Sequence, residues 1–270
     1  MEPLSPEVAL KVWERGLRAS TTRRALILLS AGGEEETELQ NLPLGERDRR
    51  LLELRAATFG PQMTAISRCP RCAEELELRL EVADLLQPAP AETLSANVAL
   101  EAAPVRFRLP TSLDLLAVEE VSDPVAAEQV LLDRCLLSVA SEEAVDTSRG
   151  QLQREEASGE ARRCVSGSAE VGRPSWVSGL STEDRQELAQ AMSEADPLAE
   201  VLLDLTCGSC GEAWQELFEI AEFLYQEVSL LAHRLLRDVA ELARCTGWTE
   251  SEILAMSPTR RQVYLELLSA

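Results

Sequence analysis

The sequence has 270 residues, 45% of them hydrophobic, which is enough for one large domain or two modest ones with a real core. Its formal net charge of −21 disfavours binding to nucleic acid, because that binding needs a cationic surface. The single histidine, His233, excludes a three-histidine metal site within the chain and limits histidine-based catalysis.

The first part of the chain, residues 1–86, is predicted to form helices followed by a cysteine knuckle. Ser5 can cap a helix that has Pro6 in its first turn and stops near Gly16. Residues 23–29 form a short apolar run that we interpret as a strand. A second helix is expected from about residue 46 to residue 58, before a Gly-Pro stop.

The first knuckle, Cys69-Pro70-Arg71-Cys72, precedes a segment of strict alternation. Residues 74–82 alternate charged and apolar side chains, with the apolar ones at Leu76, Leu78, Leu80 and Val82. A period of two is typical of a strand with one buried face, so the knuckle is expected on a β-hairpin.

The second part, residues 87–140, begins with a Pro/Ala linker over residues 87–92. Residues 105–109 alternate and predict a short strand, and two short helices follow. One starts at a capping box from Thr111 to Asp114, and the other opens at Asp123-Pro124 and reaches about Val139. Residues 141–175 are rich in Ser, Glu, Arg and Gly and are interpreted as a flexible insertion.

The last part, residues 176–270, starts with a helix capped by Ser181 and holds a second knuckle, Cys207-Gly208-Ser209-Cys210. Alternating residues 201–205 lead into this knuckle as a strand. The longest periodic segment follows it, and one apolar stripe predicts an amphipathic helix that ends at Gly247. Its members are Leu217, Ala221, Leu224, Val228, Leu231, Leu235, Val239 and Leu242. Two short helices are expected to close the chain.

The two knuckles together predict a metal site with Cys69, Cys72, Cys207 and Cys210 as ligands. Zn²⁺ takes four soft ligands in a tetrahedron, and a Cys-x-x-Cys turn can place two sulfurs on one ion. Such a site would be structural, because four thiolates leave no position for water. A redox dithiol is one alternative, but it calls for a helix opening at the first cysteine. Disulfide bonds are the other alternative.

The remaining motifs favour a protein without catalytic activity. The sequence shows no phosphate loop, no dinucleotide fingerprint and no nucleophile elbow. The first residues lack the apolar core of a signal peptide, so we expect a cytoplasmic protein with reduced cysteines. Cys135 and Cys245 are expected to be small buried side chains, Cys164 falls in the insertion, and His233 is interpreted as structural.

Two blocks of sequence carry a family resemblance. The first combines residues 41–48, Phe59-Gly60-Pro61 and the first knuckle; the second combines Asp196-Pro197, the second knuckle and residues 247–258. Together they resemble the zinc-knuckle proteins encoded in clusters for contractile phage tails and extracellular contractile injection systems. Those proteins are similar to phage baseplate hub assembly chaperones. The first knuckle departs from the common zinc-ribbon pattern, with Ala73 where glycine is frequent.

The expected fold is therefore α+β and mostly helical, with a small β zinc ribbon formed by two distant Cys-x-x-Cys knuckles and a long C-terminal amphipathic helix. The resemblance implies a non-enzymatic assembly factor or structural component of a phage-tail-like machine, with one structural Zn²⁺ and baseplate or hub subunits as partners. The alternative is a zinc-ribbon adaptor that binds nucleic acid or the transcription machinery. The net charge of −21 counts against it.

Overall fold

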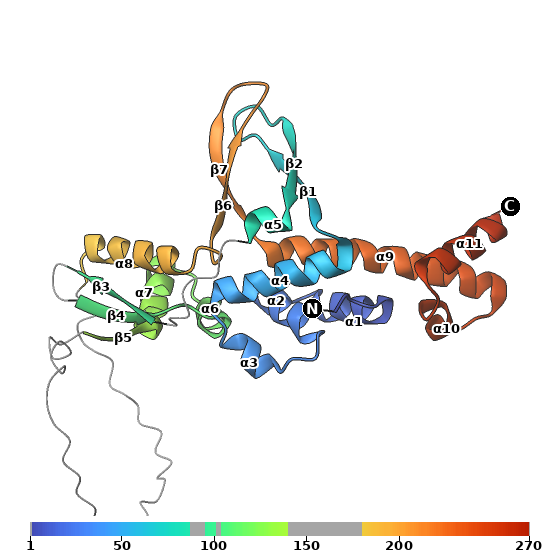
Figure 1. Cartoon of the computed structure of the whole chain (residues 1–270), viewed down its shortest axis with the longest axis horizontal. Helices are drawn as coiled ribbons and strands as arrows, with labels where there is room; N and C mark the ends of the chain where they lie inside the picture. Colours follow the sequence, from blue (N-terminus) through green and yellow to red (C-terminus); the bar gives the residue numbers. More distant parts are fainter. Residues whose placement is uncertain (1, 87–94, 101–103, 140–179, 270) are drawn as a thin grey trace, which may run out of the picture.

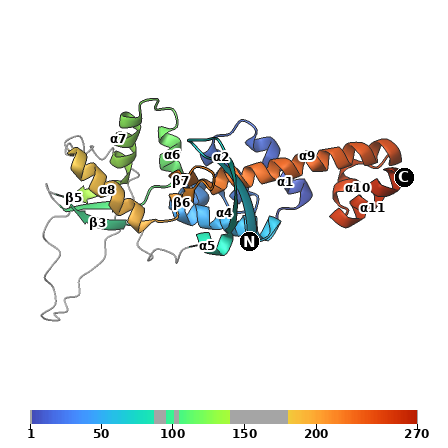
Figure 2. The same cartoon turned by 90° about the horizontal axis from the view of Figure 1, so that it is seen from above.

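The fold is organised along one helix, α9 (Ile220–Thr246), in a computed structural model that describes residues 2–86, 95–100, 104–139 and 180–269. This helix has 27 residues and buries a continuous stripe that runs from Ile220 to Leu242. It lies along the long axis of the molecule (Figures 1 and 2). The amphipathic pattern therefore marks the central support of the fold from Ala221 onward. The prediction is wrong for Leu217, which lies in the strand Ala213–Phe218 ahead of the helix and is 50% exposed.

Three helices pack against the first half of α9: α1 (Pro6–Gly16), α2 (Thr21–Ser30) and α4 (Leu44–Phe59). The short helix α3 (Glu36–Gln40) packs on α2. The apolar faces of these helices and the start of α9 form the largest buried core. The strand predicted at residues 23–29 is wrong, because these residues belong to α2. Ser20 caps this helix, and Ala25, Leu28 and Leu29 fall on its buried face at helical spacing.

The far end of α9 carries two further helices, α10 (Glu250–Leu254) and α11 (Pro258–Ser269). Gly247 ends α9 with a φ of 75°, a left-handed conformation that glycine adopts at little cost. Trp248 then packs edge-on against Tyr264, with the ring centroids 4.9 Å apart. This contact helps to fold α11 back onto α9.

A second, smaller core lies at the opposite end of the molecule. It is built from an antiparallel sheet of β3 (Ser95–Ala99), β4 (Pro104–Arg108) and β5 (Leu136–Val139). The helices α7 (Pro124–Cys135) and α8 (Thr182–Ala195) pack here, while α6 (Ser112–Val118) lies toward the helical body (Figure 1). The helix predicted to reach Val139 ends at Cys135, because the following residues pair with β4 instead.

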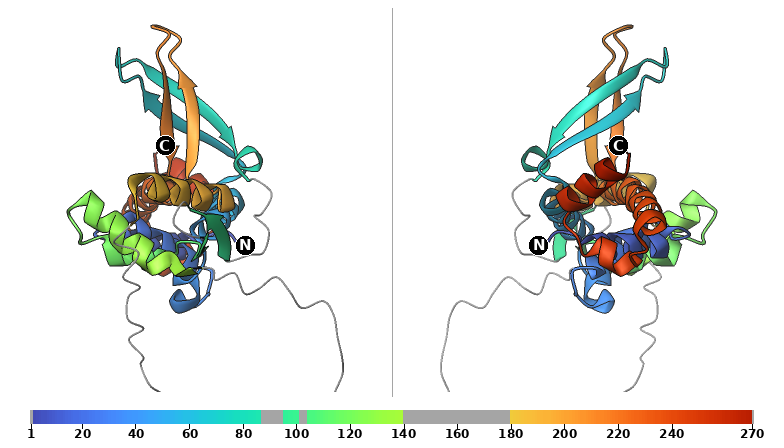
Figure 3. Two further views of the ribbon diagram at one scale, coloured as in Figure 1. Left: turned by 90° about the vertical axis from the view of Figure 1, so that its left-hand side faces the viewer. Right: turned by 90° about the vertical axis from the view of Figure 1, so that its right-hand side faces the viewer.

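Two separate β-hairpins stand up from the helical body (Figure 3). One pairs β1 (Gln62–Arg68) with β2 (Glu75–Glu81) and continues into the short helix α5 (Val82–Leu85); the other pairs β6 (Val201–Thr206) with β7 (Ala213–Phe218). Their bases join the main core through Leu80, Val201, Leu203 and Phe218. The hairpins lean toward each other so that their turns meet.

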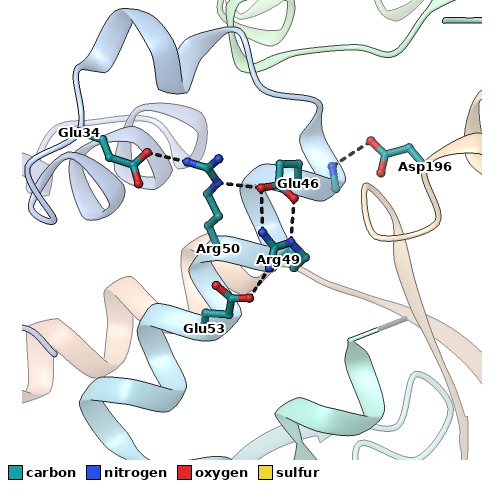
Figure 4. Close-up of polar contacts among 7 residues, drawn as sticks. Glu34, Glu46, Arg49, Arg50, Glu53 and Asp196 are labelled. Carbon is teal, nitrogen blue, oxygen red and sulfur yellow. Dashed lines mark hydrogen bonds and ion pairs between the residues drawn. The ribbon is translucent and has the colours of Figure 1, made fainter. Parts of the chain in front are cut away.

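Buried polar contacts fix the base of each hairpin. Arg55 of α4 is 3% exposed; its guanidinium donates to the carbonyls of Gly60 and Gln62 and forms two hydrogen bonds with Glu227 of α9. Ahead of β6, the Asp196 carboxylate accepts the Gly45 N–H at 2.9 Å at the start of α4 (Figure 4). A side chain at position 45 would collide with Asp196, so this approach requires glycine.

The predicted linker at 87–92 and insertion at 141–175 lie outside the described residues, and the division of the chain into four parts stays a prediction. Among the described helices, none is long and apolar enough to cross a membrane. The architecture is α+β and mostly helical, with small antiparallel sheets.

Candidate metal centre

The two knuckles have the same backbone hydrogen-bond pattern. In the first, Cys69 N–H donates to the Glu74 carbonyl, and Ala73 N–H donates to the Cys69 carbonyl, each at 2.9 Å. In the second, the equivalent bonds run from Cys207 to Glu212 at 2.8 Å and from Gly211 to Cys207 at 2.9 Å. The two hairpins therefore have turns of the same type, and each turn directs its two cysteine side chains to the same side.

The residue after each second cysteine adopts a left-handed conformation. At Gly211 φ is 74°, and at Ala73 it is 60°. Glycine adopts this region freely, whereas a Cβ makes it unfavourable by about 1–2 kcal/mol. The first knuckle is thus the more strained of the two, although both have the same shape.

All four predicted ligand residues come together at the tips of the hairpins. Their Sγ atoms lie within 4.8 Å of one another. Two of the separations join different hairpins, at 3.7 Å between Cys69 and Cys210 and 3.6 Å between Cys72 and Cys207. Zn–S bonds of about 2.3 Å in a regular tetrahedron correspond to sulfur–sulfur distances of about 3.8 Å. The four sulfurs therefore have the spacing that a tetrahedral ion requires.

Two polar contacts outside the sulfur cluster also join the hairpins. Ser67 of β1 donates a hydrogen bond to Glu216 of β7, and Arg71 in the first knuckle pairs with Glu212 in the second at 3.4 Å. The Trp214 indole N–H also donates to Glu216, at 3.4 Å. These contacts orient the turns, but an exposed ion pair such as Arg71–Glu212 adds little stability by itself.

The local electrostatics favour a thiolate at Cys207 of the second knuckle. The backbone N–H groups of Cys210 and Ser209 point at the Cys207 sulfur and lower the pKa of this thiol to about 7. Cys69 and Cys207 are buried, whereas Cys72 is exposed. An ion held by all four sulfurs has no open coordination position, so the arrangement suits a structural site and not metal-activated water.

Among the described residues, the other cysteines, Cys135 and Cys245, and the histidine are not members of this cluster. Cys135 is buried, as expected, and burial, together with the nearby Asp114 charge, raises the pKa of its thiol to about 12. The prediction that Cys245 is buried is wrong, because it lies in the last turn of α9 on the exposed side. His233 packs edge-on against Trp13, with centroids 5.2 Å apart, and Cys164 lies outside the described residues.

Sequence reasoning missed the side chains that support the hairpins from below. Arg55 and Glu227 are far apart in the chain, and no short motif joins them. One signal was present, since Arg55 occupies the apolar face of the helix expected over residues 46–58, where a charge needs a buried partner.

Comparison with protein families adds an independent finding. The model of the T4 bacteriophage base plate protein family matches residues 27–225, a span that contains both knuckles. Comparison with curated proteins and with solved structures gives no match. Because the match covers most of the sequence, it indicates a structural or assembly role in a baseplate and contact with other baseplate proteins. The chain belongs to the T4 bacteriophage base plate protein family.

Proposed function

We propose that this chain is a non-catalytic assembly chaperone for the baseplate hub of a contractile, phage-tail-like injection machine. The family match over residues 27–225 is the observation that carries the proposal. In this role the protein is a cytoplasmic factor that holds a baseplate or hub subunit during particle formation. The long α9 scaffold and the projecting hairpins supply a shape with several surfaces for such a subunit.

We further propose that the four cysteines hold one structural Zn²⁺. Tetrahedral sulfur sites suit zinc or iron, and zinc is favoured here because a purely structural clamp needs no redox change. The ion would join residues from the first third of the chain to residues from the last third. In a chain of this kind, the free energy of metal binding becomes free energy of folding for the hairpins.

Genetics and metal analysis test the two proposals separately. Deletion of the gene should stop particle formation or leave tails without a baseplate in electron micrographs; normal contractile particles would rule out the assembly role. Native mass spectrometry should find one zinc per chain, and none in the Cys207→Ser/Cys210→Ser variant. Cys245→Ser is the matched control, because this exposed cysteine lies outside the cluster and its replacement should leave the zinc content unchanged.

A further inference from the structure

A cavity of about 460 Å³ lies where the helical body meets α7, α8 and the base of β7. Its apolar walls include Leu44 of α4, Leu132 of α7, Met192 of α8 and Phe218 of β7. We call this space the junction cavity. It is far from the cysteine cluster at the hairpin tips, and its volume is that of a small ligand or of a few side chains.

An exposed pair of leucines extends the junction cavity over the surface. Leu217 lines the cavity and lies directly opposite Leu202 in the β6–β7 ladder. The two side chains are 50% and 46% exposed, respectively. Their neighbours Val201 and Leu203 point the other way and pack on the main core. The leucine pair is therefore an apolar surface left outside the fold's own packing.

The charges around the junction cavity are mainly negative. The lining acids are Asp48, Glu128, Asp196, Glu200 and Glu219, against two lining cations, Arg47 and Arg185. Arg47 already pairs with Asp48 at 2.7 Å. Within the described residues, the side chains of Glu128 and Glu200 make neither a hydrogen bond nor an ion pair.

Among the residues that the structure describes, two buried polar atoms along this wall also lack hydrogen-bond partners. Asp196 is 1% exposed; its Oδ2 accepts the Gly45 N–H, but its Oδ1 has no hydrogen bond. The Nε of Arg185 is buried and unpaired as well. Burial raises the pKa of both Asp48 and Asp196, because desolvation disfavours their charged forms. Unsatisfied buried groups are unfavourable, so a bound group that supplies both a donor and an acceptor would stabilise this wall.

We propose that the junction cavity and the Leu202–Leu217 pair dock a partner-protein segment that carries an apolar side chain next to a lysine or arginine. The apolar side chain enters between Leu132, Met192 and Phe218, and the basic one meets the acidic rim. Arg185 donates to a main-chain carbonyl of the segment. A second copy of this chain is a poor source of the positive charge, because its own net charge is −21. The inference deepens the proposed assembly role by naming what the baseplate partner presents.

Binding of short fluorescein-labelled peptides, measured by fluorescence anisotropy, tests the chemistry of the segment. A peptide of leucines and lysines should bind, and counterparts with glutamate for lysine or serine for leucine should bind at least about tenfold more weakly. Absence of binding, or equal affinity for the acidic counterpart, would overturn the inference.

Matched variants test the location, since a cationic peptide can bind any acidic surface weakly. Glu128→Lys/Glu200→Lys should weaken binding by about tenfold. Glu187→Lys/Glu194→Lys makes the same charge change on exposed positions of α8 outside the cavity and should change binding less than about twofold. Leu217→Ser should also weaken binding, whereas Ile66→Ser, at a 71% exposed position of the other hairpin, should not. Equal losses in variant and control would show non-specific attraction and overturn the inference.

Crosslinking separates the possible occupants. A photo-reactive amino acid at position 217 should crosslink to the leucine–lysine peptide, and the same group at position 66 should not. An efficient crosslink from position 217 to the chain itself would show that its own residues fill the surface, and would overturn the inference. If baseplate subunits co-purify equally well with wild type and with Glu128→Lys/Glu200→Lys, the docking surface is wrong while the assembly role stands. Normal particles in the deletion strain would remove the assembly role, and the peptide results would still decide the surface.

Discussion

At the scale of single residues, the two knuckles are the same turn made with different amino acids. Both have a left-handed residue after the second cysteine, but one uses Ala73 and the other Gly211. Space does not explain the difference, because a Cβ added at Gly211 would meet nothing within 4 Å. The left-handed backbone conformation alone therefore determines how much a Cβ at this position destabilises the turn. Ala73 and Gly211 thus allow the same turn to be compared with and without a side chain in one molecule.

Replacement of Ala73 by glycine and of Gly211 by alanine should have opposite effects on the stability of the knuckles. Ala73→Gly should stabilise the first knuckle by about 0.5–1 kcal/mol, because relief of the left-handed strain exceeds the added entropy of the unfolded chain. Gly211→Ala should destabilise the second knuckle by about 1–2 kcal/mol for the converse reason. Metal affinity in competition with a chromophoric chelator should rise in the first variant and fall in the second.

Gly208→Ala is the control for this comparison. Gly208 lies in the same knuckle, does not have a positive φ and has no neighbour that a Cβ would meet. Its replacement should not reduce the metal affinity. If Gly208→Ala and Gly211→Ala weaken the site equally, backbone strain is not the cause.

At the scale of elements, the hairpins depend on the body beneath them. A two-stranded hairpin is only marginally stable in water. Here the β1–β2 base is held by Arg55, whose guanidinium bonds to the turn before β1 and to Glu227 of α9. The Phe223 ring lies 5.9 Å from the same guanidinium. One buried side chain thus links α4, α9 and the first hairpin.

Removal of this link should be strongly destabilising. Arg55→Met leaves Glu227 without its partner in a largely buried position and should lower the free energy of unfolding by about 3–5 kcal/mol in urea denaturation. Glu227→Gln is a milder test that keeps part of the hydrogen bonding.

Arg49→Ala is the matched control on the same helix. Arg49 belongs to the partly exposed series of ion pairs along α4, with Glu46 and Glu53 (Figure 4). Its loss should cost no more than about 1 kcal/mol. An Arg55→Met effect as small as that of Arg49→Ala would show that the buried link is not needed.

Local signals predicted most of the helices and the two knuckles. The capping box at Thr111–Asp114 and the helix cap at Ser181 are confirmed, because a cap depends on residues only three positions apart. The prediction failed where tertiary pairing decides. Residues 136–139 fit a helical pattern but form β5, since β4 offers them a partner strand, and residues 23–29 join the helical core.

The meeting of the cysteines was predictable for a chemical reason. Four cysteines in two equal motifs suit one tetrahedral ion, whatever the length of chain between them. The junction cavity was not predictable, because its walls come from α4, α7, α8 and β7 and no spacing in the sequence relates them. In addition, the sequence does not show whether an apolar residue such as Leu217 is buried in a core or remains exposed.

At the scale of the whole molecule, two different kinds of interaction hold two regions of the fold together. The helical body has a large apolar core, with α9 as its central member. Within the described part of the chain, the sulfur cluster and two polar contacts join the hairpin tips. The fold should therefore respond to metal loss in one region and not as a unit.

Removal of the metal should release the hairpin tips and leave the helical body folded. After treatment with a strong chelator, hydrogen exchange measured by mass spectrometry should speed up by about tenfold or more in β1, β2, β6 and β7, because two-stranded hairpins lose their protection when their ends separate. Peptides from α9 and α4 should keep their protection, and the far-UV circular dichroism should change little, since most of the helix lies outside the hairpins. Cys207→Ser/Cys210→Ser should show the same pattern without chelator, and Cys245→Ser should behave as wild type. Equal loss of protection in α9 would mean that the ion supports the whole fold. Unchanged exchange in the hairpins would mean that the ion stabilises neither the hairpins nor the helical body.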